Sequence, residues 1–195
     1  SAARTGAPGS AEASVIGPDG RARGSYRKIH LVPFGEYVPL KKLLFFIGPL
    51  VEAVSDFSPG TDVAVLDLAD GMRGSVAICY ESTYPSLARA FVQRGAGVLF
   101  VVTNDGWFGR SSAAFQHFEM GALRAIENGR YLARAANTGI TAVVDPYGRV
   151  VARANMFEAL TLGAEVRVLG ARTLYSRLGD VVAWLSAALT LILAW

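Results

Sequence analysis

The sequence predicts an α/β fold in which strands and helices alternate along the chain. Residues 74–79 and 97–103 each read as a buried strand, the second apolar on both faces, because apolar residues continue without a polar alternation. Residues 84–94, which lie between them, show the apolar spacing of a helix. A strand, a helix and a strand in this order predict two parallel strands joined by a right-handed crossover.

The N-terminal third is predicted to contain one β-hairpin. Residues 13–26 fit two strands around the turn Pro18-Asp19-Gly20, because proline presets φ and glycine permits a positive φ. Residues 1–14 are small and rich in glycine and proline, so we expect little order there beyond a strand remnant near Gly6. Residues 43–54 predict a short, broken helix.

Three further elements are predicted downstream. Residues 63–68 alternate as a strand does, and residues 113–135 form the longest helical pattern in the chain. Residues 141–152 predict a second hairpin through the turn D-P-Y-G.

Composition excludes several classes of protein. A net charge of +3 in 195 residues is too small and too evenly spread for a nucleic-acid binder. The single cysteine excludes an internal disulfide. His30 and His117 are too far apart in sequence to indicate a metal site, so we expect both to be structural, and nothing in the sequence calls for a metal or a cofactor.

The C-terminal end is apolar. Residues 181–195 carry no charge over fifteen positions, whereas about twenty residues are needed to cross a bilayer. The run fits either a buried core helix or the first part of a transmembrane helix. With a mean hydropathy of +0.33 for the whole chain, we expect a truncated transmembrane helix over residues 178–195, in a chain that is a piece of a longer protein.

Cys79 lies where a predicted buried strand ends and a helix begins. Open α/β sheets bind ligands at the carboxyl ends of their strands. A thiol near a helix N-terminus is also favoured as a thiolate by the helix dipole. Position alone leaves two interpretations open, because a free cysteine is also among the residues most often simply packed in a core.

Three segments occur in register around this cysteine: Y-R-K-I-H-L-V-P-F-G-E-Y-V-P, A-I-C-Y-E and T-N-D-G-W-F-G. Together they resemble the carbon-nitrogen hydrolase (nitrilase) superfamily, and within it the apolipoprotein N-acyltransferase branch. The later strings Q-H-F-E-M-G-A-L-R-A-I-E and N-T-G-I-T-A-V-V-D-P-Y-G extend the resemblance to about residue 150. It implies a nitrilase-like α-β-β-α sandwich over residues 1–175, truncated at its N-terminus.

The resemblance also implies the catalytic residues. Cys79 matches the nucleophile and Lys28 the catalytic lysine. Glu36 matches a supporting acid in the F-G-E-Y-V-P loop, and Glu81 matches the acid just after the nucleophile. Their structural alternatives are a solvated surface lysine for Lys28, a loop acid for Glu36, and for Glu81 an acid that stabilises the following helix through its dipole.

Two more residues complete the expected site. Acyl transfer passes through a tetrahedral oxyanion, which Lys28 and the backbone N–H of Tyr80 are placed to stabilise. Trp107 matches an aromatic residue in the acyl-binding part of the site, with a plain core position as its alternative. Asn104-Asp105-Gly106 has two equally good interpretations: part of the same site motif as Trp107, or a simple turn after a strand.

The activity implied is an acyl transfer at a membrane. An acyl chain would pass from a phospholipid through a Cys79 thioester to the N-terminal amine of a diacylated apolipoprotein. The resemblance places such a domain on the periplasmic face of the bacterial inner membrane. It also implies a general-base glutamate in a Pro-Glu context, but Glu12 is the only acid before Asp19 and does not match. We therefore expect residues 1–195 alone to be inactive.

Two other functions stay open. A soluble amidase would use the same Cys-Lys-Glu residues with water as the acceptor. A membrane-tethered scaffold without activity would account for the unmatched base.

Overall fold

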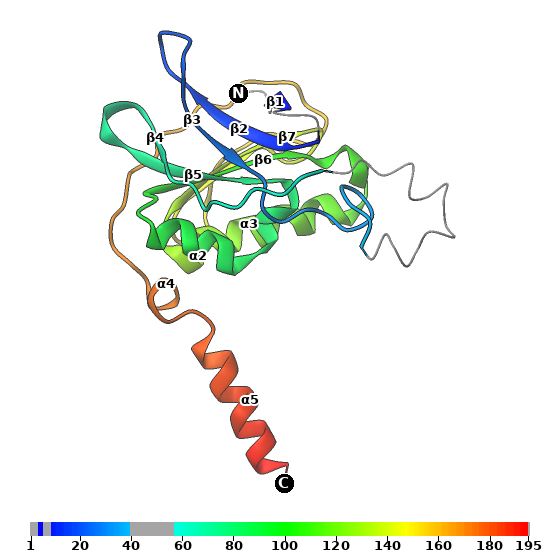
Figure 1. Cartoon of the computed structure of the whole chain (residues 1–195), viewed down its shortest axis with the longest axis vertical. Helices are drawn as coiled ribbons and strands as arrows, with labels where there is room; N and C mark the ends of the chain where they lie inside the picture. The colour runs from blue at the N-terminus through cyan, green and yellow to red at the C-terminus, as the bar shows by residue number, and fades with distance from the viewer. Residues whose placement is uncertain (1–3, 6–8, 40–56, 195) are drawn as a thin grey trace.

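The computed structural model describes residues 4–5, 9–39 and 57–194, and it contains two β-sheets. The larger sheet has six strands in the order β4-β5-β6-β7-β8-β9, and the smaller has three in the order β1-β2-β3. Figure 1 shows α2 and α3 on one side of the large sheet and the β2–β3 hairpin on the other. The sequence-based expectation of an α/β fold is confirmed.

The centre of the large sheet is parallel. β5 (Arg73–Ile78) pairs in parallel with β6 (Val98–Asn104), and β6 pairs in parallel with β7 (Tyr131–Asn137). The helix α2 (Pro85–Gln93) connects β5 to β6, as the predicted strand-helix-strand unit requires. Because the parallel strands end at the same edge of the sheet, Ile78 and Asn104 bring their following loops together there.

Antiparallel strands flank this centre. β8 (Ala142–Val144) and β9 (Val150–Arg153) form the predicted second hairpin, with β8 also paired to β7. On the opposite side β4 (Leu66–Asp67) pairs with β5, and it is much shorter than the strand predicted over residues 63–68.

The small sheet holds the predicted N-terminal hairpin. β2 (Ala11–Ile16) pairs with β3 (Ala22–Arg27), and β1 (Arg4–Thr5) adds to β2. The prediction of little order through residue 14 was therefore wrong for the residues of β2. Their sequence is too polar to stand out as a strand, but the pairing with β3 orders them. The predicted helix at residues 43–54 lies outside the described residues.

One core joins the helices to both sheets. Tyr26 at the end of β3 lies edge-to-face against Phe91 of α2, with ring centroids 5.5 Å apart. Buried residues of the same cluster come from α2, from β6 and from α3 (Ser112–Asn128), and include Leu87, Val92, Leu99, Val101, Phe118 and Ala122. In β6, Leu99 and Val101 belong to this core, and the half-buried Val102 packs against it. On the other face Val98 is buried but Phe100 is only half-buried, so the prediction that this strand is buried on both faces was wrong beyond its first residues.

The prediction of one long helix over residues 113–135 was also wrong. Helix α3 ends at Asn128, because Gly129 takes the left-handed conformation (φ 61°, ψ 45°) and its N–H donates to the carbonyls of Ala125 and Ile126. The residues after it form β7, whose side chains alternate between the helices and the opposite face. The sequence Y-L-A-R-A fits a helix as well as a strand, and pairing with β6 decides between them.

The C-terminal residues leave the layered body. After α4 (Leu174–Leu178), the helix α5 (Val181–Leu193) extends away from the sheets with its side chains exposed (Figure 1). In the part of the chain that the structure describes, no helix has the length and apolar content that a bilayer crossing requires. The membrane helix expected over residues 178–195 stays a prediction.

Gly129 offers a test of the helix-to-strand boundary. Replacing Gly129 by alanine should lower the free energy of unfolding by about 1–2 kcal/mol, because a Cβ in the left-handed region meets its own backbone. The added atom would also lie 3.0 Å from Cγ2 of Thr173. Denaturant titration of Gly129→Ala against Gly163→Ala measures the effect, since a Cβ at Gly163 meets nothing within 4 Å. Equal stability of the two variants would contradict this account of the boundary.

Candidate active site

Cys79 follows β5 directly and has a positive φ of 56°. A residue with a Cβ rarely takes this conformation, and it persists only where surrounding contacts hold it. The carbonyl oxygen of Cys79 accepts from Oγ of Ser82 at 3.2 Å, and the Tyr80 carbonyl accepts from Oγ1 of Thr83 at 2.8 Å. The strand thus ends in a sharp turn that carries the thiol into the 3-10 helix η3 (Cys79–Thr83).

Glu81 holds this turn from the core side. Its carboxylate is buried, with 1% of the residue exposed. Oε1 accepts hydrogen bonds from the Tyr26 hydroxyl at 2.8 Å, the Ile29 N–H at 2.7 Å and the His30 N–H at 3.0 Å, and Oε2 accepts from the Ile78 N–H at 2.8 Å. Burial, followed by the negative charge of Glu81 and the bond to it, raises the pKa of Tyr26.

Lys28 and Glu36 form a buried ion pair beside this turn. Nζ of Lys28 lies 2.6 Å from Oε1 of Glu36, and only 1% of Lys28 is exposed. Oε2 of Glu36 accepts from the Val32 N–H at 2.9 Å, which closes the loop between the two residues. Lys28 is therefore not the solvated surface lysine of the alternative interpretation, because its charge is withdrawn from water and compensated by Glu36.

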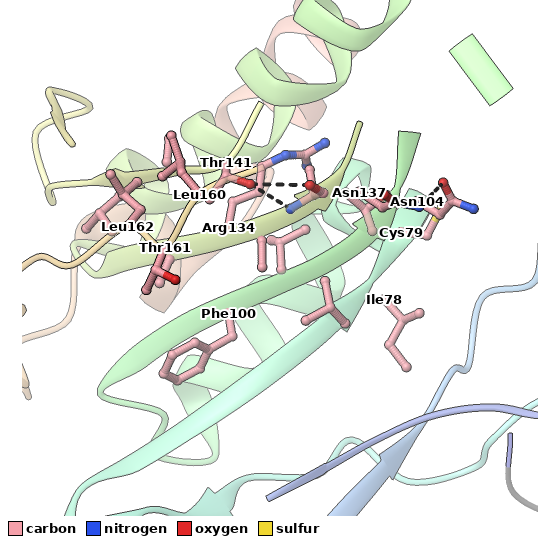
Figure 2. A pocket seen from close by; sticks show the side chains of 18 of the residues that line it. Ile78, Cys79, Phe100, Asn104, Arg134, Asn137, Thr141, Leu160, Thr161 and Leu162 are labelled. Carbon is pink, nitrogen blue, oxygen red and sulfur yellow. Dashed lines mark hydrogen bonds between the residues drawn. The ribbon is translucent and has the colours of Figure 1, made fainter. Parts of the chain in front are cut away.

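A cavity of about 980 Å³ opens in front of Cys79. Glu36, Cys79 and Trp107 line it together. Its floor is the face of β6, β7 and β8 that the helices leave free, and its lining is mostly apolar: Phe100, Val102, Ala133, Ala135, Val143, Leu160 and Leu162. Figure 2 shows Cys79 and Asn104 at one end of the cavity and Leu160, Thr161 and Leu162 at the other.

The expected site residues differ in where the structure places them. Cys79, Glu36 and Trp107 line the cavity, whereas Lys28 is not among its lining residues and contacts Glu36 from behind. Trp107 is 83% exposed, so it is not a core residue as the alternative had it. Glu81 is not among the lining residues, and both its oxygens already accept hydrogen bonds.

Sequence reasoning missed a buried charged cluster behind Cys79. Asp105, His117 and Arg134 come from the loop after β6, from α3 and from β7, and all three are buried. Nη2 of Arg134 lies 2.7 Å from Oδ2 of Asp105, and Nδ1 of His117 lies 3.0 Å from Oδ1. The sequence signal was the Asp105 of N-D-G-W-F-G and the His117 of Q-H-F-E, which we interpreted as a turn and as a structural histidine.

The charges of this cluster are mutually stabilised. Burial disfavours the Asp105 carboxylate, but the hydrogen bond from His117 and the charge of Arg134 more than offset it, so the pKa of Asp105 lies below its usual range. Burial lowers the pKa of Arg134, and Asp105 opposes this shift. Over the described ranges no group of three or more His, Cys, Asp or Glu is arranged to hold a metal ion.

Residues 7–173 match the family model described as carbon-nitrogen hydrolase. The chain belongs to the carbon-nitrogen hydrolase family. A carbon-nitrogen hydrolase structure from Helicobacter pylori G27 superposes with a TM-score of 0.60 at 21% identity, covering 76% of this chain and 54% of that chain. This likeness establishes the nitrilase-like fold of two sheets with helices.

Sequence identity is higher to proteins named apolipoprotein N-acyltransferase than to that solved structure. The protein with that name from Geobacter metallireducens is 47% identical over 176 residues, covering 90% of this chain and 34% of that protein. The chain thus spans about a third of the length of the curated relatives it matches. A mutant amidase from Nesterenkonia sp. AN1, 25% identical with a TM-score of 0.55 and 76% and 55% coverage, carries a covalent addition at its active site cysteine.

Substitution of Glu81 tests how much its four hydrogen bonds stabilise this carbon-nitrogen hydrolase site. We expect Glu81→Gln to lower the free energy of unfolding by at least about 2 kcal/mol, because an amide brings its own donor against buried N–H groups. Glu119→Gln, on the exposed face of α3, is the matched control. Chemical denaturation of both variants decides the matter, and a Glu81→Gln protein as stable as the control would show that the four bonds contribute little.

Proposed function

We propose that the chain is the catalytic part of an N-acyltransferase that works through a Cys79 thioester. Its acyl donor is a phospholipid, and its acceptor is the N-terminal amine of a diacylglyceryl-cysteine apolipoprotein. The observation that carries the proposal is the 47% identity, over 90% of this chain, to a protein named apolipoprotein N-acyltransferase. The geometry around Cys79 supports it, because Cys79 and Glu36 line one mostly apolar cavity and Lys28 is bonded to Glu36.

Cys79 is the nucleophile in this proposal. Its turn resembles other strained strand-to-helix corners that present a reactive side chain to a cavity. The related amidase from Nesterenkonia sp. AN1 is modified covalently at its active site cysteine. A thiolate attacks an ester carbonyl far more readily than a hydroxyl does, so a thioester divides a difficult transfer into two easier steps.

The first step forms the thioester. Sγ of Cys79 bonds to the carbonyl carbon of the phospholipid ester, and the ester C–O bond breaks. The thiol proton passes by way of a base to the departing oxygen, which leaves as the hydroxyl of a lysophospholipid.

In the second step the acceptor amine bonds to the same carbon and the C–S bond breaks. The amine gives up one proton, and Cys79 is regenerated with the new amide as product.

Both steps need positive charge and an N–H donor at the tetrahedral oxyanion. Lys28 supplies the charge, and its bond to Glu36, which lines the cavity, orients the ammonium group. The backbone N–H of Tyr80 is the second donor. Thr83 supports it, because its hydroxyl bonds the Tyr80 carbonyl and fixes the orientation of the residue.

Neither acid of the site is placed to take the thiol proton. Both oxygens of Glu36 and both of Glu81 already accept hydrogen bonds. We therefore assign Glu36 to the placement of Lys28 and Glu81 to the support of the turn. The general base that the family resemblance implies, a glutamate in a Pro-Glu context, has no match within these 195 residues.

The cavity suits an acyl chain. Aliphatic and small side chains along β6, β7 and β8 offer apolar contact, and the charged lining residues are Glu36 and Arg134, the latter with a fully buried side chain. Trp107 at the entrance presents a large exposed aromatic surface, which suits contact with a lipid. Phospholipid as donor implies action at a membrane, and we propose the periplasmic face of the bacterial inner membrane. The exposed, uncharged α5 supports membrane contact.

The proposal is tested in the full-length protein with a phospholipid labelled in its acyl chain. We expect the label on the peptide that contains Cys79, removable by neutral hydroxylamine as a thioester is, and its transfer to an added diacylated lipopeptide. Cys79→Ala and Cys79→Ser should give no labelled peptide and no transfer, because alanine has no nucleophile and serine needs a far stronger base. Glu119→Gln serves as the control and should behave as the unaltered protein does.

The same experiment separates the two alternatives. Release of free fatty acid at an equal rate with and without lipopeptide would identify a hydrolase that uses water. Absence of label on Cys79 in a folded, membrane-inserted protein would contradict catalysis and favour a scaffold.

A further inference from the structure

The buried cluster of Asp105, His117 and Arg134 has no part in the steps described above. It lies on the helix side of the large sheet, behind the turn that carries Cys79. Its three members come from three different elements, and all are shielded from water. Burying three charged groups is costly unless they are paired and bonded, so their role must be sought in what they contact.

One contact leads directly to the nucleophile. Nε2 of His117 lies 3.2 Å from the carbonyl oxygen of Cys79 and 3.1 Å from Oγ of Ser82. On the other side of the ring, Nδ1 faces the Asp105 carboxylate. Asp105 in turn is held by Arg134 and by the hydroxyl of Thr103 at 2.9 Å. A continuous chain of contacts therefore runs from β7 to the backbone of Cys79.

The partners of His117 differ on the two sides of its ring. The Cys79 carbonyl oxygen only accepts hydrogen bonds, so Nε2 donates to it. Nδ1 lies 3.0 Å from Oδ1 of Asp105 and 3.1 Å from Nη2 of Arg134, so this side of the ring is held by both charged groups. The direction of the Nε2 bond is assigned from the heavy-atom partners.

The hydrogen bond from His117 is made to Cys79, the strained residue of the turn. Cys79 is held at φ 56°, a conformation that costs energy for any residue with a Cβ. Its N-terminal neighbour is fixed through the bond from the Ile78 N–H to Glu81. On the other side, its carbonyl is fixed by Ser82 and His117. Releasing the carbonyl would let the peptide rotate and carry the thiol away from the cavity.

We propose that Asp105, His117 and Arg134 are positioning residues for the nucleophile, acting through the hydrogen bond from His117 to the Cys79 carbonyl. Arg134 orients Asp105, Asp105 orients the His117 ring, and His117 fixes the turn. The inference rests on the proposed function in one respect, that Cys79 is the reactive thiol.

Two features support this role over a purely structural ion cluster. Burial lowers the pKa of Arg134, while Asp105 and, as the smallest contribution, Cys79 oppose the shift. Nη1 of Arg134 is buried without a hydrogen-bond partner in the described part of the chain. A cluster built for stability alone would satisfy each of its charged donors, because an unmet buried donor costs free energy.

Glycines keep the cluster compact. A Cβ at Gly139 would overlap the Asp105 carboxylate, and a Cβ at Gly121 would lie 3.7 Å from Nη1 of Arg134. Gly139 thus leaves the room that Asp105 needs beside Arg134.

The test compares His117→Leu, which removes the ring donor, with His117→Gln, whose amide can still donate to the Cys79 carbonyl. Glu119→Gln is the control, because Glu119 lies on the same helix as His117 and is exposed. The measurement in the full-length protein is the rate of Cys79 alkylation by iodoacetamide, followed on the Cys79 peptide by mass spectrometry and normalised to the folded fraction. We expect His117→Leu to slow alkylation about 10- to 100-fold.

The expected pattern has three parts. His117→Gln should recover most of the lost rate, and Glu119→Gln should match the unaltered protein. Thr103→Val, a milder change that removes one bond to Asp105, should slow alkylation by a smaller factor. In acyl transfer the two His117 variants should lower kcat and leave KM nearly unchanged, because His117 is not among the residues that line the cavity.

Alkylation needs neither phospholipid nor lipopeptide, so it tests the positioning role even if acyl transfer is absent. Unchanged alkylation in folded His117→Leu would overturn the proposal. So would a His117→Gln protein as slow as His117→Leu, since that result would leave no part for the hydrogen bond to the Cys79 carbonyl.

Discussion

The site depends on the buried carboxylate of Glu81. It accepts from the backbone that leaves β3, at Ile29 and His30, and from the backbone that ends β5, at Ile78. These segments lie far apart in the sequence, and a carboxylate withdrawn from water must find donors for both oxygens. Very few arrangements of the two segments satisfy that requirement, and in the one observed Cys79 and Glu36, the partner of Lys28, line one cavity.

Hydrogen bonds hold the peptide groups on both sides of Cys79 in the sequence. Glu81 fixes the peptide before it, and Ser82 and His117 fix the peptide after it. The strain of the positive φ is thus maintained by bonds to several separate elements, and no single loop carries it. In the proposed transfer, a thiol held this way needs little reorganisation before it attacks, and such positioning contributes strongly to rate.

Local patterns predicted most of the elements, and motifs predicted candidate site residues, of which Cys79, Glu36 and Trp107 line the cavity. The Pro18-Asp19-Gly20 turn and the strand-helix-strand unit depend on neighbouring residues, so periodicity and turn chemistry were sufficient. The helix predicted beyond Asn128 failed because only Gly129 marks its end, and pairing with β6 makes the next residues a strand. The roles of Glu81 and His117 could not be predicted, since their partners lie on distant elements.

Successive side chains of β7 point to opposite faces of the sheet, so the residues that shape the cavity alternate with the residue that contacts the charged cluster. Ala133 and Ala135 face the cavity, whereas Arg134 between them points to α3 and reaches Asp105 and His117. Small side chains in front leave space for an apolar substrate, and the charge behind acts on the turn without entering that space. Cavity shape and nucleophile placement can therefore change independently, because substitutions on one face of a strand leave the side chains of the other face in place.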